Sequence, residues 1–434
     1  MVCCLTIPSL YFFTTISRGT VMNLVLTIEH RFAATPDGAV WTQTTFAYPF
    51  WRRYLEVFES VRVVARVRDV SEVSGDWKRA DGEGVSFARI PYYLGPEQFL
   101  WHAIRVTRSV RNAVTSEDAV IMRVPSTLAN LLAPSMVKRG HPFGLEVVGD
   151  PYDVFAPGAF RHPLRPLLRW WFVRSLRWQC ARAAAAGYVT RTALQRRYPL
   201  NVSKEFVYSS VELKEKIFKK PFFTVYSDVQ LASDDFAHSH SSRRGRDGPV
   251  TLLFVGSLAQ MYKAPDVLID SVALCVRRGL DIRLIMVGDG KHRSELERRA
   301  ATHGLQECVR FMGQLPREGV QKWLDQADLF VLPSRQEGVP RAMLEAMARG
   351  LPCIGSTVGG IPELLPPEDM VPPGDVVALA DKICEVLRDP ERMAQMSARN
   401  FQKALEYREE VLREQRLYFY HEVRKITEEW QKQK

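Results

Sequence analysis

Short apolar runs alternate with longer helical stretches along this chain, and this pattern constrains its fold more than any other feature. Strands of about 4–8 residues that alternate with helices favour a parallel sheet with helices on both faces. In the first half the expected strands are Leu24–Ile28, Val61–Val67, Ala119–Met122 and Gly144–Val148, with helices at Gln43–Glu59 and Thr127–Arg139.

The same alternation restarts after residues 227–248, a stretch rich in Ser, Asp and Arg that has the composition of a linker. The expected strands there are Val250–Val255, Arg283–Val287, Val309–Met312, Leu329–Leu332 and Pro352–Gly355. The expected helices are Ala264–Arg278, Lys291–His303, Gln321–Gln326 and Pro340–Arg349. We therefore predict an α/β protein with two doubly wound, Rossmann-like domains, 22–226 and 249–405.

The tail from Phe401 onward has a helical pattern throughout. Its apolar positions recur every three to five residues from Leu412 to Trp430, which predicts one buried stripe on a long helix over 406–434. At the other end, residues 1–21 contain an apolar stretch. A secretory signal would have Lys or Arg before this stretch, and none is present here. Residues 1–21 are a leader or the product of a misassigned start, with Met22 as the true first residue.

Charge and cysteine content narrow the function classes. The net charge of +10 favours anionic partners. No nucleic-acid-binding module is recognisable, so we do not expect the protein to bind nucleic acid. Seven cysteines without a CxxC pair support neither a disulfide framework nor a zinc site, and scattered thiols suit the cytoplasm. No run of eighteen apolar residues predicts a membrane-spanning helix.

The segment EGVPRAMLE, from Glu337 to Glu345, carries the clearest chemistry. Glu337 follows a predicted strand, at the sheet edge where open α/β sheets bind ligands. Gly338 lets the backbone approach a ligand, and Pro340 suits a helix start, whose free N–H groups favour a diphosphate. The helix is too apolar to be exposed, so its carboxylate Glu345 calls for a partner.

The stretch PSRQEGVPRAMLEAMARGLPCIGSTVGGIPELL resembles the signature of group 1, family-four retaining glycosyltransferases of the GT-B fold. The similarity continues back through LLFVGSLAQMYKAPDVLIDS and IRLIMVGDG, and covers residues 249–400 most strongly. The resemblance implies a hexosyltransferase (EC 2.4) with a central cleft between its domains, and a last helix packed back on the N-terminal domain. It implies a nucleoside-diphosphate sugar donor and a glycan or lipid-linked glycan acceptor, in cell-surface or exopolysaccharide synthesis.

Individual roles also follow from the resemblance. It implies that Glu337 contacts the transferred sugar, that Glu345 binds the ribose hydroxyls and that Lys263 neutralises the departing diphosphate. No DxD-type acidic motif is present in a matching context, so we expect neither a metal nor another cofactor. The remaining donor-binding positions implied are Gly256, Ser257, Gly288, Met312, Gly313, Gly338, Val339 and Pro340.

The chain departs from the family at two places. Ser257 stands where the family often has an arginine, and Gly149 stands where a histidine is common at the cleft. The glycine-rich loop after the first strand is reduced to Asp37-Gly38. The expected acceptor or cleft residues are Asp37, Gly38, Arg123 and Asp150, although Arg123 also suits a surface salt bridge.

The stretch from Arg161 to Trp178 combines arginines at four-residue steps with Leu and Trp on an adjoining helical face. The expected apolar face consists of Leu164, Leu167, Leu168, Trp171 and Trp178. Such a helix suits either an anionic membrane surface or a core position with solvated arginines. The first alternative would place a cytoplasmic protein on the inner face of the cytoplasmic membrane.

Two other functions remain open from the sequence. A nucleotide-sugar epimerase of the same fold would place the nucleotide and a hydrolytic water where this chain has its acceptor cleft. A phosphorylase, by contrast, would need a pyridoxal-binding lysine and a much longer chain, and nothing in the sequence supports it. A non-catalytic, membrane-associated nucleotide-binding protein would not need the carboxylates and lysine that this chain retains.

Overall fold

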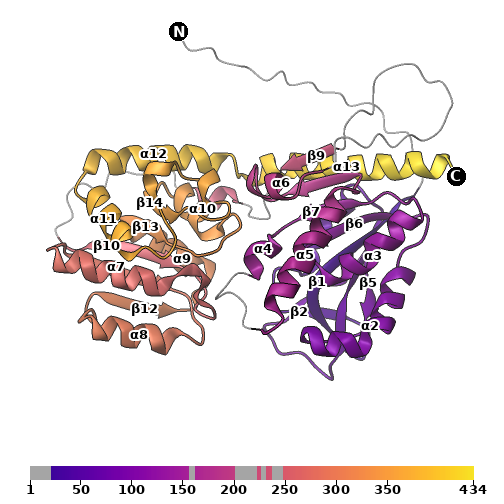
Figure 1. Cartoon of the computed structure of the whole chain (residues 1–434), viewed down its shortest axis with the longest axis horizontal. Coiled ribbons are helices and arrows are strands. Elements are labelled where there is room, and N and C mark those ends of the chain that lie inside the picture. Colours follow the sequence, from indigo (N-terminus) through magenta and orange to yellow (C-terminus); the bar gives the residue numbers. More distant parts are fainter. Residues whose placement is uncertain (1–20, 156–161, 201–221, 226–230, 237–247) are drawn as a thin grey trace, which may run out of the picture.

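The computed structural model describes residues 21–155, 162–200, 222–225, 231–236 and 248–434. These form two α/β domains side by side, with the last helix running along the first domain (Figure 1). The expected leader up to residue 20 and most of the expected linker lie outside the described residues.

The N-terminal sheet is built from parallel strands in the order β5-β3-β1-β6-β7-β8-β9, and antiparallel β2 and β4 extend the far half of β1. The strands are β1 (Asn23–Ala34), β2 (Val40–Thr42), β3 (Ser60–Asp69), β4 (Lys78–Arg79), β5 (Val85–Ile90), β6 (Ala119–Val124), β7 (Gly144–Val147), β8 (Ala185–Tyr188) and β9 (Phe222–Val225). The prediction that the first strand ends at Ile28 is wrong. A register shift between Thr27 and Arg31 lets β1 continue to Ala34, where it gains β2 as a partner.

Alternating residues of the strands sort the helices onto the two faces of this sheet. Val25 of β1 packs in a cluster with residues of α2, α3 and α5, whereas its neighbours Leu24 and Leu26 pack with α1 and α13. The helices are α1 (Tyr48–Leu55), α2 (Gly95–Asn112), α3 (Thr127–Lys138), α4 (Pro151–Val154), α5 (Arg165–Cys180) and α6 (Ala193–Arg197).

The C-terminal sheet is entirely parallel, in the order β12-β11-β10-β13-β14-β15. Its strands are β10 (Val250–Val255), β11 (Ile282–Val287), β12 (Val309–Gly313), β13 (Leu329–Leu332), β14 (Cys353–Ser356) and β15 (Met370–Val371). The helices are α7 (Pro265–Arg277), α8 (Arg293–Thr302), α9 (Arg317–Gln326), α10 (Arg341–Ala348), α11 (Val376–Leu387) and α12 (Pro390–Leu405). In both sheets the first strand lies in the middle, and later strands are added on either side of it.

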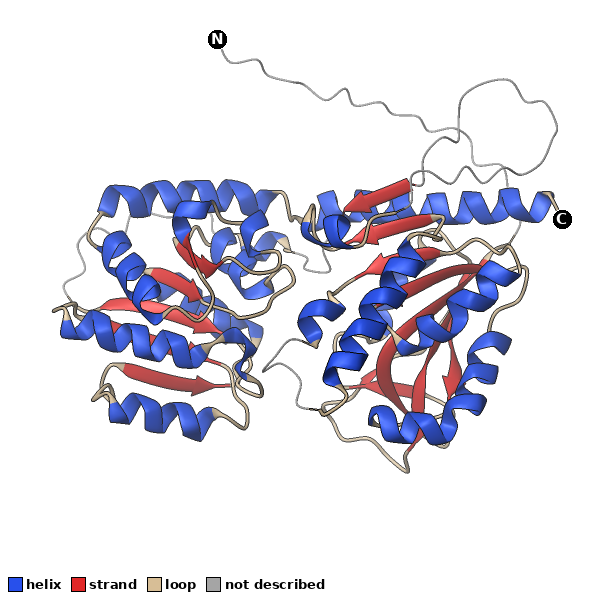
Figure 2. Ribbon diagram, in the orientation of Figure 1, coloured by secondary structure: helices blue, strands red, loops and turns tan. Residues whose placement is uncertain are grey.

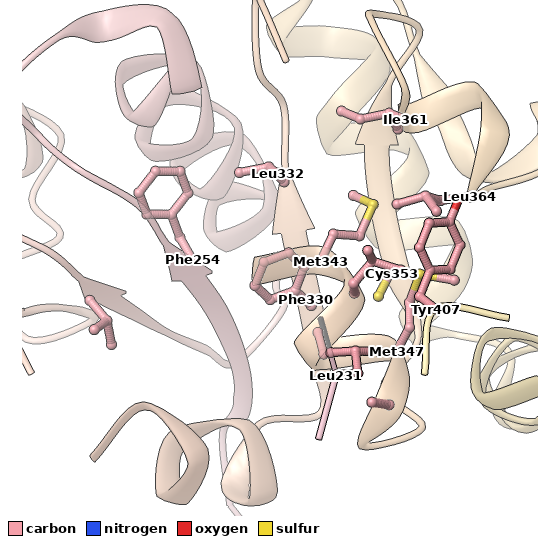
Figure 3. Close-up of a cluster of buried hydrophobic side chains, with 14 of the residues drawn as sticks. Leu231, Phe254, Phe330, Leu332, Met343, Met347, Cys353, Ile361, Leu364 and Tyr407 are labelled. Atoms are coloured by element: carbon pink, nitrogen blue, oxygen red, sulfur yellow. The ribbon is translucent and has the colours of Figure 1, made fainter. Parts of the chain in front are cut away.

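The core of the C-terminal domain lies directly below the edge where its strands end (Figure 3). Met343 and Met347 of α10 are fully buried beside Phe330 of β13 and Cys353 of β14. This packing explains why the helix that carries Glu345 is so apolar. The strands of both domains end toward the boundary between the domains (Figure 2), which is the arrangement of the predicted GT-B fold.

The last helix, α13 (Glu409–Lys432), belongs to the N-terminal domain by its contacts. The Tyr420 hydroxyl donates a hydrogen bond of 3.2 Å to Glu146 of β7, and the Trp430 ring lies 4.3 Å from the His141 ring. The predicted return of this helix to the N-terminal domain is confirmed. The prediction of unbroken helix from Phe401 is wrong, since residues 406–408 separate α12 from α13.

The chain enters and leaves the C-terminal domain at one place. The Leu231 backbone N–H donates to the Tyr407 carbonyl at 3.3 Å, and the Glu409 N–H donates to the Leu231 carbonyl at 3.2 Å. Leu231 is buried, and so is Asp235, which pairs with Arg317 at 2.7 Å. The described part of the predicted linker is therefore packed against the C-terminal domain.

Candidate active site

The middle of the C-terminal sheet is a topological switch point. β10 pairs with β11 on one side and with β13 on the other, so the loops that follow β10 and β13 lead away in opposite directions. Ligands of open α/β sheets bind in the crevice that such diverging loops create. Lys263 lies in the first loop and Glu337 in the second.

These two side chains are in direct contact. Lys263 Nζ donates to Glu337 Oε1 at 2.7 Å, and the Ser334 hydroxyl donates to the same oxygen at 2.9 Å. The lysine side chain is 14% exposed and the glutamate side chain 9%. A charged pair so well shielded from water interacts more strongly than a surface pair. The structure thus brings together the two residues to which the sequence assigns the main chemistry.

A second ion pair fixes the relative position of the same two loops. Arg335 makes a bidentate contact with Asp266 at 2.8 and 2.7 Å, and its backbone N–H donates to the Tyr262 carbonyl at 2.7 Å. Bidentate arginine–carboxylate pairs are geometrically specific. Sequence reasoning missed this pair. The sequence marks Arg335 and Asp266 only by their positions near the motif residues Glu337 and Lys263.

The loops at this edge approach one another backbone to backbone. A Cβ on Gly288, at φ +134°, would lie 2.0 Å from the Gly256 carbonyl oxygen. A Cβ on Gly359, at φ +55°, would lie 1.7 Å from the carbonyl oxygen of Glu337. Only glycine fits at either position. Gly256 in turn makes room for the Lys263 side chain, since its Cβ would lie 2.4 Å from Lys263 Cδ.

Two helices begin at the switch point without a side-chain cap. α10 starts after Pro340, which occupies the capping position rather than the predicted first turn, and α7 starts after Ala264. Ala264 is in the left-handed region at φ 52°, which is unfavourable for a residue with a Cβ and is typical of functional sites. The first N–H groups of both helices lack side-chain acceptors and suit an anion.

The other predicted donor residues lie around this point. Glu345 accepts a hydrogen bond of 2.8 Å from Arg341 one helical turn earlier, and its side chain is 17% exposed. Gly338 has open space where a side chain would lie, and its carbonyl accepts from the Gly360 N–H at 2.8 Å.

Ser257, in place of the family arginine, is exposed. Val339 packs on the core, Gly313 accepts a backbone hydrogen bond from Gly288, and Met312 precedes it at the end of β12.

The N-terminal candidates are not gathered in the same way. Asp37 and Gly38 form the turn between β1 and β2, where Asp37 accepts from the Thr35 hydroxyl at 2.5 Å. That hydrogen bond is the main cause of a lowered Asp37 pKa. Asp150 caps α4 by accepting from the Tyr152 N–H at 2.8 Å, and it pairs with Arg197.

Arg123 lies in the interior, so both sequence interpretations, an open cleft position and a surface salt bridge, are wrong. Its side chain is 5% exposed and pairs with Glu146, which is fully buried. The guanidinium also lies 5.4 Å from the centre of the Phe50 ring. The pair faces α1 and α13, which cover this side of the sheet and bury it.

One contact joins the two domains at the edge of the candidate site. The Glu363 carboxylate, which follows the Gly359-Gly360 loop, accepts from the backbone N–H groups of Arg191, Thr192 and Ala193 at 2.6, 3.0 and 3.0 Å. A carboxylate with several N–H donors makes charge-assisted hydrogen bonds. This contact was not predicted, because the partners are far apart in the sequence.

Across the described ranges, no group of three or more His, Cys, Asp or Glu side chains is arranged to hold a metal ion. The expectation that no metal or cofactor is needed stays a prediction.

Residues 249–389 match the family model for glycosyl transferases group 1. Protein CapJ of Staphylococcus aureus is 28% identical over 343 residues, which cover 78% of this chain and 80% of CapJ. Residues 249–389 of this chain form a group 1 glycosyltransferase domain. The alpha-D-kanosaminyltransferase of Streptomyces kanamyceticus is 31% identical over 41% of this chain, and the match spans only half of that relative.

Solved structures of glycosyltransferases share the fold over nearly the whole chain. Sucrose-phosphate synthase from Thermosynechococcus elongatus has a TM-score of 0.62 and 18% identity, covering 93% of this chain and 99% of its own. Anabaena Alr3699/HepE, solved in complex with UDP-glucose, has a TM-score of 0.59 and 15% identity, covering 92% and 98%. The predicted GT-B fold of this glycosyltransferase is thereby confirmed.

Proposed function

We propose that this glycosyltransferase moves a sugar, with retention of configuration, from a nucleoside-diphosphate sugar to a glycan or lipid-linked glycan acceptor in cell-surface polysaccharide synthesis. The observation that carries the proposal is the Lys263–Glu337 pair between two uncapped helix starts at the switch point. A cation and two sets of free N–H groups suit a diphosphate, and a carboxylate beside them suits sugar hydroxyls.

The acceptor class rests on relatives. CapJ aligns over most of both chains, and the amylovoran biosynthesis glycosyltransferase AmsK of Erwinia amylovora is 35% identical over 30% of this chain and 34% of its own. The name of AmsK gives it a role in making a polysaccharide. The UDP-glucose complex of HepE supports a nucleotide sugar as the donor.

In the proposed reaction, the acceptor hydroxyl attacks the anomeric carbon on the face from which the diphosphate leaves. The bond between that carbon and the diphosphate oxygen breaks, the new glycosidic bond forms, and the hydroxyl proton passes to the departing oxygen. Lys263 stabilises the charge that develops on the diphosphate. Glu337, freed from Lys263 when the donor binds, holds the sugar.

No metal takes part in this proposal. The arginine that Ser257 replaces is compensated by Lys263 together with the N–H groups at the starts of α7 and α10. Arg335 and Arg341 are each already paired with a carboxylate. Activity should therefore persist in the presence of a chelator such as EDTA, and loss of turnover on chelation would contradict this part of the proposal.

The test combines donor binding with turnover. UDP, GDP and their sugars are screened by thermal shift, since a ligand at about 100 times its Kd adds roughly 2.7 kcal/mol of stability. Release of nucleoside diphosphate is then measured with the stabilising donor, for the wild type and for Lys263→Ala and Glu337→Ala. Each variant should lose at least about 100-fold in turnover, in the range for a lost charge-stabilising group.

Lys322→Ala is the matched control, because Lys322 is an exposed lysine of α9 in the same domain. Full turnover in the Lys263 and Glu337 variants would show that the site is wrong. Conversion of the donor into an epimer without release of the diphosphate would favour an epimerase. Binding without any turnover would favour a non-catalytic nucleotide-binding protein.

A further inference from the structure

The outer surface of the N-terminal domain exposes large apolar side chains to an unusual degree. On α2, Trp101 is 88% exposed, Ile104 80% and Leu100 71%. Ile104 follows Leu100 by four positions and Trp101 by three, so the three side chains lie on one side of the helix, opposite the buried Val106 and Val110. Exposed apolar groups of this size and density mark interaction surfaces rather than ordinary protein surface.

The neighbouring helices continue this surface. α2, α3 and α5 lie side by side on one face of the sheet, and α3 contacts both of the others (Figure 1). On α5, Leu167 is 57% exposed and Trp170 60%. Trp171 and Trp178, which the sequence analysis places on the apolar face of this helix, are both half-buried. Arg161 lies outside the described residues.

The three helices carry a strong excess of positive charge. They carry three arginines on α2, one lysine on α3 and four arginines on α5, against a single carboxylate, Glu97. Arg105 and Arg108 are exposed beside Trp101 and Ile104. On α5, the Arg174 guanidinium lies 5.9 Å from the centre of the Trp170 ring.

We propose that the outer faces of α2, α3 and α5 form a docking surface for an anionic lipid bilayer. Apolar and indole groups surrounded by arginine match the layered chemistry of a bilayer interface, where acyl chains lie below anionic headgroups. A nucleic acid would match the arginines but not the exposed Leu and Ile. No helix in the described part of the chain is long and apolar enough to cross a bilayer. The surface is separate from the donor site, so the proposal goes beyond the proposed function.

Vesicle sedimentation tests the proposal. Full-length protein is mixed with vesicles of phosphatidylcholine alone or of phosphatidylcholine with 30% phosphatidylglycerol, at about 0.05 and 0.3 M salt. We expect binding to the anionic vesicles that weakens as salt rises, because headgroup attraction is screened. Absence of binding to the anionic vesicles at low salt would overturn the proposal.

Two pairs of substitutions separate the apolar and electrostatic contributions. Trp101→Ser with Ile104→Ser removes apolar side chains, and Arg105→Glu with Arg108→Glu reverses two charges. Each pair should weaken vesicle binding by at least roughly tenfold. Both should keep the wild-type melting temperature, because all four side chains are exposed. Val377→Ser and Arg298→Glu are matched controls on exposed sites of α11 and α8.

The controls should bind vesicles as the wild type does. Unchanged binding by both double variants, or equal loss with Arg298→Glu, would overturn the assignment to this face. Sedimentation velocity without lipid examines the alternative occupant, a second copy of the chain. A dimer that Trp101→Ser with Ile104→Ser dissociates would also overturn the proposal.

Discussion

The two sheets of this glycosyltransferase share a strand order, but their switch points differ in how the nearby helix starts are used. In the C-terminal domain, α7 and α10 begin without a side-chain cap. In the N-terminal domain, the start of α3 is fully occupied, because Ser126 caps it and Glu29 accepts from the Thr127 N–H at 2.8 Å. The first N–H groups of α7 and α10 therefore have no side-chain acceptor, whereas those of α3 stabilise the N-terminal domain itself.

The same contrast holds for charged groups. The N-terminal domain buries its central pair, Arg123 and Glu146, under α1 and α13, where the hydroxyls of Tyr54 and Tyr420 also donate to the carboxylate. The C-terminal domain keeps Lys263 and Glu337 partly exposed at a loop edge. Buried pairs serve the structure, whereas a pair that a ligand can reach can exchange partners.

The largest expected effect tests the buried pair. Arg123→Leu leaves the Glu146 carboxylate buried without its cation, so it should lower the free energy of unfolding by about 3–5 kcal/mol. Adding Glu146→Gln removes the unpaired charge and should recover part of this loss. Urea unfolding followed by tryptophan fluorescence measures both changes. A loss below about 1 kcal/mol in Arg123→Leu would show that the pair does not stabilise the domain.

The next effect tests the glycine-dependent backbone contacts of the C-terminal domain. Gly288→Ala places a Cβ 2.0 Å from the Gly256 carbonyl oxygen and should cost more than about 3 kcal/mol, at the upper end for overpacking. Gly304→Ala is the control, since Gly304 has φ +71° but open space for a Cβ. It should cost only about 1 kcal/mol for the left-handed conformation. Thermal unfolding distinguishes them, and equal costs would contradict the steric explanation.

A smaller effect tests the contact between the domains. Glu363→Gln keeps the shape of the side chain but removes its charge, which should weaken hydrogen bonds to the N–H groups of residues 191–193 by roughly 1 kcal/mol. Small-angle X-ray scattering should then show a larger radius of gyration. Glu368→Gln is the control, because Glu368 is exposed on the same domain. An unchanged radius in Glu363→Gln would mean that this contact does not hold the domains together.

At neutral pH the smallest effect concerns a histidine of the N-terminal domain. Burial, reinforced by Arg31 and Arg66, lowers the pKa of His30 from 6.5 to about 4. Between these values the unfolded chain binds up to about one more proton than the folded chain at this residue, so stability should fall as pH drops from 6.5 to 4. His30→Gln should make the plot of unfolding free energy against pH flatter in that window. An identical slope in both proteins would contradict the shift.

The difference between the domains also explains what the sequence could predict. Glu337, Gly338 and Lys263 lie within short motifs whose strand–loop–helix setting is local, so their position at the sheet edge follows from the sequence. Glu29 bonds to Thr127, 98 positions away, and Arg123 bonds to Glu146, 23 positions away. No local sequence pattern predicts these contacts. The same holds for Glu363, whose partners lie at least 170 positions away.

Surface exposure was hardest to foresee. The helical pattern around Trp171 predicts an amphipathic helix, but it does not say which face the sheet will cover. Trp170 and Trp101 emerge as exposed only once α2, α3 and α5 are placed together.

The return of α13 to the N-terminal domain has a consequence for biosynthesis. Strands between residues 23 and 225 form the sheet, and Tyr420 of the last helix completes the cover over the buried Glu146. A ribosome makes the N-terminal domain first, and domains generally fold in that order. Here the first domain to emerge must wait for the last helix to be translated, while the second domain, whose core ends with Tyr407, can finish folding before it.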